Sequence, residues 1–207
     1  MEQSIARDSI YSADRMNHPL GMSRRFAEIA FTPAVREAQA RYGVQAKSSQ
    51  LRGDALGPRE VEYLAAADTF YLATVSETGW PYVQHRGGPK GFLRVLSPTQ
   101  LGYADFRGNL QYLSVGNVAR NDRASILVMD YAERRRLKLL GRLRFIDVAD
   151  ADAALVRQVD LPGYAARVER VALFDVVAFD WNCPQHITQR FTLDELSHAA
   201  PRKRGNA

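Results

Sequence analysis

The chain has 207 residues, 46% of them hydrophobic and 25% charged, and a formal net charge of +5 at pH 7. This composition supports one folded domain with an apolar core and excludes an intrinsically disordered chain. No apolar run approaches the ~18 residues of a membrane-spanning helix, and no signal-peptide pattern is present, so a cytoplasmic location is expected. The single cysteine, Cys183, excludes an intrachain disulfide, and no Cys/His spacing indicates a metal site.

The N-terminal part of the chain carries helix signals. Residues 1–20 have no periodicity and predict an extended arm. Thr32-Pro33 predicts an N-cap followed by a helix to about Tyr42, and Gly57-Pro58 opens a second short helix. We expect residues 1–57 to form an arm and helix that pack on a domain over residues 58–192, with a C-terminal tail over 193–207.

From Thr69 onwards the sequence has the β-branched and aromatic composition of strands. The predicted strands cover residues 69–75, 81–86, 92–96, 101–104, 125–131, 137–146 and 171–179. Two short helices are expected between them, over 113–119 and 150–156. Because no helix of 10–15 residues separates consecutive strands, an antiparallel barrel with helical additions is favoured over a parallel sheet.

The first polar cluster, Gln84, His85, Arg86, Gly87 and Gly88, follows a predicted strand. A guanidinium donates to phosphate through a fork of N–H groups, and glycines let backbone N–H groups approach an anion. The alternative interpretation is a polar rim that ends in a Gly-Gly bend.

The second cluster occupies residues 105–117 and is rich in small hydrogen-bonding groups, among them Asp105. Ser114, Gly116 and Asn117 stand at the start of a predicted short helix, where free N–H groups favour phosphate. The alternative is a loop of turn residues with a helix cap. The segment matches neither a Walker motif nor a GxGxxG fingerprint.

Two further clusters lie nearer the C-terminus. Strand alternation places Arg136, Lys138, Arg142 and Arg144 on one face of a strand, which attracts phosphate or is simply solvated. The segment 181–191, WNCPQHITQRF, contains side chains that stack on flat rings or read heterocycle edges. The candidates in it are Trp181, Gln185, His186 and Arg190. Cys183 is interpreted as a packed thiol, and His186 as a structural residue or a general acid or base.

Several motifs occur in an order that resembles the pyridoxamine 5′-phosphate oxidase-like, FMN-binding split-barrel superfamily. They are FYLATV (70–75), GWP (79–81), QHRGG (84–88), NDRASIL (121–127) and GRLR (141–144). QHRGGPKGFL, DFRGNLQYLSVGN and WNCPQHITQRF further resemble a bacterial subgroup described as oxidase-related. The resemblance covers about residues 60–192.

The resemblance implies a six-stranded antiparallel split β-barrel, a homodimer, and FMN bound in clefts at the dimer interface. The oxidase's Arg-x-Val-Leu-Leu-Lys pattern falls on residues 84–89, where the lysine is absent. Its Ser-Arg-Lys phosphate clamp falls near residues 112–114 and is absent too. The family's C-terminal tryptophan and arginine have counterparts in Trp181 and Arg190. These departures argue against vitamin B6 oxidation more than against the flavin.

The resulting hypothesis is an FMN-dependent oxidoreductase with an unknown substrate and no assigned catalytic side chain. Arg86, Ser114 and Asn117 would hold the phosphate, with Arg136 or Lys138 in support, while Gln84, Asp105 and Gln185 would contact the ring. The alternatives are a split barrel that binds haem or a deazaflavin, a non-catalytic flavin-binding module, and a nucleic-acid-binding module. No RNA- or DNA-binding signature supports the last of these.

Overall fold

The computed structural model describes residues 21–44, 51–181 and 185–199. The seven strands are β1 (Thr69–Val75), β2 (Pro81–Gly87), β3 (Arg94–Ser97), β4 (Gln100–Phe106), β5 (Arg123–Asp130), β6 (Arg135–Asp147) and β7 (Val168–Trp181). The helices are α1 (Arg24–Ala30), α2 (Pro33–Arg41), α3 (Pro58–Ala65), α4 (Leu113–Arg120), α5 (Ala153–Val159) and α6 (Leu193–Ala199). The expected arm over 1–20, the thiol of Cys183 and the basic residues 202–204 lie outside the described residues.

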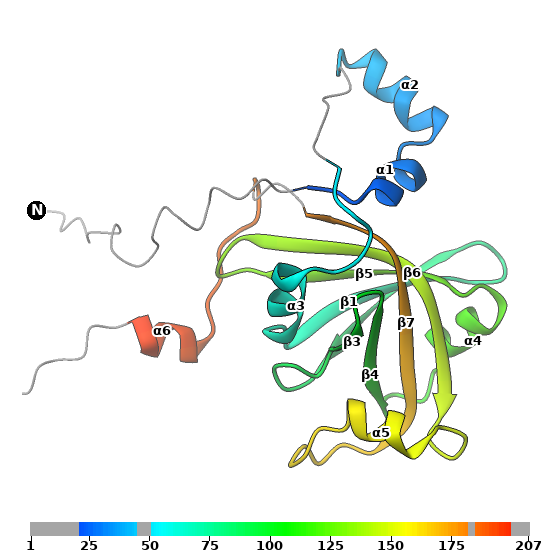
Figure 1. The fold of residues 1–207 in the computed structure, drawn as a ribbon, viewed down its shortest axis with the longest axis vertical. Coiled ribbons are helices and arrows are strands. Elements are labelled where there is room, and N and C mark those ends of the chain that lie inside the picture. Colours follow the sequence, from blue (N-terminus) through cyan, green and yellow to red (C-terminus); the bar gives the residue numbers. More distant parts are fainter. Residues whose placement is uncertain (1–20, 45–50, 182–184, 200–207) are drawn as a thin grey trace, which may run out of the picture.

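The strands form one antiparallel sheet in the order β2-β1-β5-β6-β7-β4-β3. The sheet curls on itself (Figure 1), so that β2 comes close to β4, and the ion pair of Arg86 and Asp105 bridges the two strands. In the described sheet, backbone pairing joins β2 only to β1. The result is the expected split barrel, mainly β with helical additions.

All seven segments predicted as strands are strands. The barrel expected with six strands therefore has a seventh, β3, whose four residues pair with β4 alone at the edge of the sheet. The long strand β6 follows the predicted alternation, because Leu137, Leu139 and Leu143 are buried while the basic residues between them face outwards.

Four of the six helices match predicted ones, namely α2, α3, α4 and α5, and α1 and α6 were not predicted. Ser23 caps α1 by accepting a hydrogen bond from the N–H of Phe26 (3.4 Å). Thr192 and Glu195 cap α6 reciprocally, because the Glu195 carboxylate accepts from the Thr192 N–H (2.7 Å) and the Thr192 hydroxyl accepts from the Glu195 N–H (3.2 Å). This Thr-x-x-Glu pattern is a readable helix start, so the tail does contain a helix that its sequence indicated.

The main core fills the barrel and is rich in aromatic rings. Phe70 stacks on Phe92 and meets Tyr103 edge to face. A second, smaller apolar cluster lies between α5 and the outer face of β4 and β7. Of the N-terminal segment expected to pack on the barrel, α1 contacts β7 and buries Phe26, whereas α2 buries no residue.

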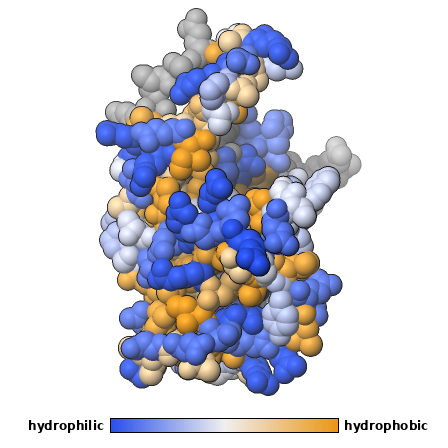
Figure 2. All heavy atoms as spheres, turned by 90° about the vertical axis from the view of Figure 1, so that its right-hand side faces the viewer, coloured by the Kyte–Doolittle hydropathy of each residue, from blue (hydrophilic) through white to orange (hydrophobic). Residues whose placement is uncertain are grey.

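Figure 2 views the molecule from the side on which α4 lies. Hydrophilic and hydrophobic residues are interspersed over this face, and the α1–α2 segment stands out from the barrel. Among the described residues, no helix is long and apolar enough to cross a membrane.

Candidate functional site

Strand β2 presents different residues to its two faces. Gln84 and Arg86 are half-buried and turn towards the opening between β2 and β4, where both line a cavity. His85 turns to the other face, where its Nε2 lies 2.5 Å from the hydroxyl of Thr69 and its ring meets Tyr71 edge to face. The structure therefore places Gln84 and Arg86, but not His85, in one site.

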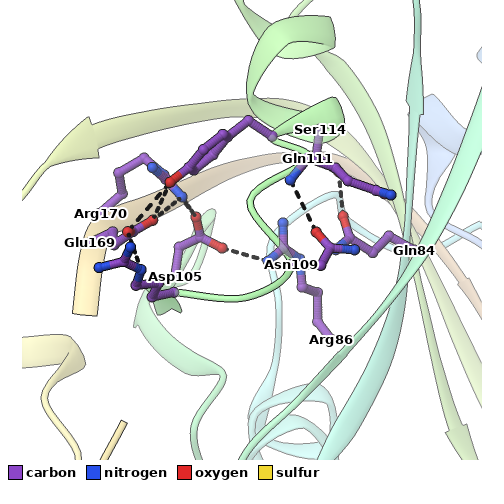
Figure 3. Close-up of polar contacts among 10 residues, drawn as sticks. Gln84, Arg86, Asp105, Asn109, Gln111, Ser114, Glu169 and Arg170 are labelled. Carbon is purple, nitrogen blue, oxygen red and sulfur yellow. Dashed lines mark hydrogen bonds and ion pairs between the residues drawn. The ribbon is translucent and has the colours of Figure 1, made fainter. Parts of the chain in front are cut away.

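Asp105 lies near the end of β4 and is 1% exposed. Its Oδ1 accepts a hydrogen bond from Nη1 of Arg86 (2.5 Å), and its Oδ2 accepts one from Nε of Arg170 (2.8 Å) (Figure 3). Because both oxygens are occupied by guanidinium groups, Asp105 holds two arginines rather than facing a ligand ring.

The first turn of α4 borders the same cavity. Ser114 is buried, and its hydroxyl donates to Oε1 of Gln84 (3.0 Å), so the hydroxyl links α4 to β2. Asn117 lies one turn later and donates from Nδ2 to the hydroxyl of Thr74 (3.0 Å). The first N–H groups of a helix have no carbonyl partner within it. The N-cap residue, Tyr112, gives them no side-chain acceptor.

The loop between β4 and α4 forms the rim of the cavity. Leu110 and Tyr112 have left-handed backbone conformations, with φ of 62° and 49°. The Tyr112 hydroxyl donates to Glu169 (3.3 Å), and the guanidinium of Arg170 lies 4.9 Å from the centre of the Tyr112 ring. Sequence reasoning missed Glu169 and Arg170, because only the register of β4 against β7 brings the start of β7 to this loop. Tyr112 lies within the predicted cluster of residues 105–117, but no role was assigned to it.

These groups enclose a cavity of about 50 Å³. Its lining residues are Tyr82, Gln84, Arg86, Asp105, Phe106, Gly108, Asn109, Leu110, Gln111, Tyr112, Leu113, Ser114, Val115 and Arg170. Nε of Arg86 is buried and has no hydrogen-bond partner, and neither has the buried hydroxyl of Tyr103. Buried polar groups are rarely left unpaired, so these atoms indicate a missing partner in or beside the cavity.

Burial and the charges at this site shift the pKa values of Tyr103 and Arg170. Burial raises the pKa of Tyr103 above its ordinary value. For Arg170, burial lowers the pKa, but hydrogen bonds and attraction from Asp105 and Glu169 outweigh burial and leave it raised. Arg170 is thus a permanent cation held between two carboxylates.

Two of the predicted glycines do not line the cavity. A Cβ on Gly87 would lie 3.1 Å from the His85 ring and 3.4 Å from the Asp68 carbonyl oxygen, so this glycine serves close packing. Gly116 is exposed, and its N–H already donates to the carbonyl of Tyr112 (2.9 Å). Neither glycine therefore lines the cavity in which the sequence suggested that glycine N–H groups bind an anion.

The predicted basic residues of β6 lie on its outer face. Nζ of Lys138 pairs with Asp180 (3.1 Å) and lies 5.3 Å from the centre of the Phe26 ring. Arg136 is half-buried opposite Met129, and its Nε is buried without a partner. These side chains make no contact with the cavity at α4.

Trp181 is 3% exposed and belongs to the main core. Its Nε1 donates to Oε1 of the buried Glu60 (2.7 Å). Arg59 lies over the indole at 4.3 Å, and Tyr63 meets it edge to face at 4.7 Å. The indole is enclosed by its own chain and has no free face for stacking on a ligand.

Of the other predicted residues of the C-terminal segment, Arg190 lies near the turn between β5 and β6. Arg190 lies 5.1 Å from the centre of the Tyr131 ring, while Gln185 and His186 are exposed. In Figure 1 this segment and α6 lie on the opposite side of the molecule from α4. Within one chain the predicted site residues therefore form two separate groups.

A larger open depression of about 770 Å³ lies at the other end of α4. Its charged lining is paired, because Arg142 binds both oxygens of Asp122 (2.7 and 3.0 Å) and Arg120 lies 3.7 Å from Glu77. None of the buried polar atoms without a partner lies in it. In the described part of the chain, no three His, Cys, Asp or Glu side chains cluster as a metal site would require.

Comparison with solved structures finds related folds. HupZ of Group A Streptococcus has a TM-score of 0.50 at 12% identity, over 66% of this chain and 99% of that one. An FMN-binding protein of Syntrophomonas wolfei has a TM-score of 0.46 at 12% identity, over 72% and 95%. A pyridoxamine 5′-phosphate oxidase-related, FMN-binding protein of Nostoc punctiforme has a TM-score of 0.41 at 19% identity, over 62% and 85%. At 12% identity the likeness to HupZ shows the fold alone.

No curated protein matches the chain. The family model described as pyridoxamine 5′-phosphate oxidase matches residues 56–180, which is more than half of the chain and includes the whole sheet up to the penultimate residue of β7. The chain therefore belongs to the pyridoxamine 5′-phosphate oxidase family.

Proposed function

We propose that this protein binds FMN non-covalently, as a homodimer, and transfers electrons through it. The observation that carries the proposal is the buried N–H of Arg86, which has no partner and belongs to a residue lining the cavity at the start of α4. Family membership supports the flavin as the ligand whose phosphate would fill this cavity.

The donors at the cavity suit a phosphate. A guanidinium binds phosphate through several N–H groups, and the first turn of a helix offers backbone N–H groups and a partial positive charge. Three arginines, Arg86, Arg107 and Arg170, stand beside two carboxylates, Asp105 and Glu169, so that the group has a net charge of +1.

The cavity of one chain is too small for a whole flavin. Ligand pockets commonly measure about 300–1,000 Å³, whereas this cavity measures about 50 Å³ and accommodates little more than a phosphate. The isoalloxazine ring would then lie outside it and need walls from elsewhere. A second copy of the chain could supply them from the separate group that includes Arg136, Lys138 and Arg190.

The outer face of the sheet offers a surface for that second copy. Tyr71, Ala73, Val83, Leu127 and Met129 face outwards from β1, β2 and β5 and are half-buried or exposed. None of them belongs to either apolar core. An exposed apolar sheet face of this kind supports self-association.

In the proposed complex, bound FMN supplies two-electron redox chemistry through its ring. The chain's own part is to bind the phosphate at Arg86 and α4, to orient the ring and to exclude water. The family's lysine and Ser-Arg-Lys clamp are absent from residues 84–89 and 112–114, so we propose the family's cofactor without its vitamin B6 substrate.

The test combines spectroscopy with one variant. The purified protein should show the absorption bands of oxidised flavin, and the ligand released by denaturation should have the mass of FMN; haem or deazaflavin bands would contradict the proposal. Replacing Arg86 by Ala should weaken FMN binding by about tenfold or more, because hydrogen bonds to a charged group are lost.

Riboflavin, which lacks the phosphate, should bind the wild type and Arg86→Ala equally in fluorescence titrations. The matched control is Arg142→Ala, which removes an exposed arginine paired with Asp122 and should leave FMN binding unchanged. Equal FMN binding by wild type and Arg86→Ala would rule out the phosphate site.

A further inference from the structure

Five charged side chains form a row of alternating sign, and three of them, Arg86, Asp105 and Arg170, line the cavity (Figure 3). Arg86 pairs with Asp105 (2.5 Å), and Asp105 pairs with Arg170 (2.8 Å). Arg170 pairs in turn with Glu169 (3.2 Å), and Glu169 with Arg107 (3.7 Å). The row links β2, β4, β7 and the loop after β4, which are not all neighbours in the sheet.

The two inner arginines use their donors differently. Arg170 donates to Asp105 through Nε and to Glu169 through Nη2, and its guanidinium covers the Tyr112 ring. Arg86 donates to Asp105 through Nη1, while its Nε is buried without a partner. Two nitrogens of Arg170 are therefore engaged by carboxylates of its own chain, whereas only Nη1 of Arg86 has such a partner and Arg86 retains donors for a ligand.

Burial strengthens these ion pairs. The side chains of Asp105, Arg170 and Arg86 are 1%, 12% and 17% exposed, so water screens their interactions far less than those of surface ion pairs. A buried guanidinium that loses its carboxylate is strongly destabilised and moves to find another partner. The position of the Arg86 side chain thus depends on Asp105, and the position of the Asp105 side chain depends on Arg170.

Arg170 also contacts the loop that leads into α4. Its guanidinium lies against Tyr112, whose hydroxyl is bound by Glu169, and Tyr112 is the N-cap residue of α4. One arginine at the start of β7 therefore holds both groups that face the cavity, the guanidinium of Arg86 and the first turn of α4.

We propose that Arg170 and Asp105 are positioning residues of the phosphate site. Arg170 fixes Asp105, and Asp105 fixes Arg86 with its free N–H groups towards the cavity. This inference rests on the proposed flavin function for its ligand, but the coupling between the two arginines exists in the protein without ligand.

The test is a double-mutant cycle on four flavin-free proteins: wild type, Arg86→Ala, Arg170→Met and the double variant. FMN and riboflavin are titrated into each by flavin fluorescence. We expect Arg170→Met to weaken FMN binding by about tenfold and to leave riboflavin binding unchanged, a selectivity that general loss of structure would not produce. The double variant should bind FMN more tightly than the product of the two single effects predicts, because both act through Arg86.

Two further variants test whether the effect is specific to the Arg170 guanidinium. Arg170→Lys keeps the charge but cannot hold two carboxylates and a ring at once, so it should not restore FMN binding. Arg144→Met removes an exposed arginine paired with Asp175 and should behave as wild type.

The outcomes separate this inference from the proposed function. If Arg86→Ala weakens FMN binding while Arg170→Met does not, or if the two effects simply multiply, the positioning role is wrong and the flavin site stands. If the wild type does not bind FMN, the proposed function fails. If the wild type and Arg86→Ala bind FMN equally, the phosphate site lies elsewhere and the positioning role is wrong. Urea unfolding of the four proteins measures the coupling between the two arginines without ligand, and additive stabilities would overturn the inference.

Discussion

Gly141 lies where β6 meets a shift in its register with β7. The pairing moves between Leu140 and Gly141, and a Cβ at this position would overlap the carbonyl oxygen of Asp175 and the ring of Phe174. The alternation of β6 predicted that this residue faces inwards. It could not predict why a glycine is needed, because the close approach depends on a strand about 35 residues further along the chain.

We predict that Gly141→Ala lowers the free energy of unfolding by about 1–3 kcal/mol or more, through overpacking against β7. Gly116→Ala is the matched control, since nothing lies within 4 Å of its added Cβ and its helix is exposed there. That variant should gain about 0.4–1 kcal/mol. Urea unfolding measures both, and equal stability of the two variants would contradict the packing argument.

Helix α3 attaches the N-terminal segment to the barrel through one buried carboxylate. Oε1 of Glu60 accepts hydrogen bonds from Arg52 (2.9 Å) and from the Trp181 indole (2.7 Å), and Oε2 accepts from the Gly57 N–H (2.9 Å). The start of this helix was readable from Gly57-Pro58. The hydrogen bond between Trp181 and Glu60 could not be predicted, because Trp181 lies far along the chain from Glu60 and was interpreted as a ligand contact.

We predict that Glu60→Gln destabilises the protein by about 1–3 kcal/mol, because an amide nitrogen would face an N–H donor and leave buried groups unpaired. Glu62→Gln changes an exposed residue of the same helix and should have little effect. Thermal unfolding together with Trp fluorescence reports both the stability and the indole environment. An unchanged melting temperature for Glu60→Gln would refute the role given to this carboxylate.

The barrel as a whole brings β2, β4, α4 and the start of β7 together at one cavity, but it does not bring the other predicted residues there. Gln84 and Ser114 meet at the cavity through a hydrogen bond, whereas Arg190 lies beside Tyr131, on the side opposite α4. The hypothesis of one convergent site therefore requires two chains. The apolar outer face of the sheet is the surface through which we expect them to associate.

We predict that Leu127→Lys converts a dimer into a folded monomer, because a charge placed on this face opposes its burial against a second copy. Leu127 is half-buried on the outer face of β5 and belongs to neither core, so the barrel itself should tolerate the change. Light scattering coupled to size exclusion measures the mass, and circular dichroism checks the fold.

Val61→Lys is the control, because Val61 is 38% exposed on α3, away from that face. It should leave the dimer intact. A wild-type protein that is monomeric at all concentrations would refute the dimer, and an unchanged mass for Leu127→Lys would place the interface elsewhere.

The sequence by itself determined the elements and the family. Strand alternation, turn residues and the Thr32-Pro33 cap are local signals, and they predicted seven strands and four helices. The order of the motifs between residues 70 and 144 identified the split barrel, because each motif is a local pattern that can be read from the sequence. They also placed Gln84, Arg86 and Ser114 in the site, because each lies beside a turn or helix start whose chemistry favours an anion.

Only the tertiary structure decided which of these side chains meet and which are already engaged. It gave Asp105 two arginine partners, enclosed Trp181 beside Glu60, and brought Arg170 to the cavity through the register of β4 and β7. The hydrogen bonds among these pairings join residues 19, 65 and 121 positions apart. They depend on how the sheet curls, and no local pattern in the sequence records that curvature.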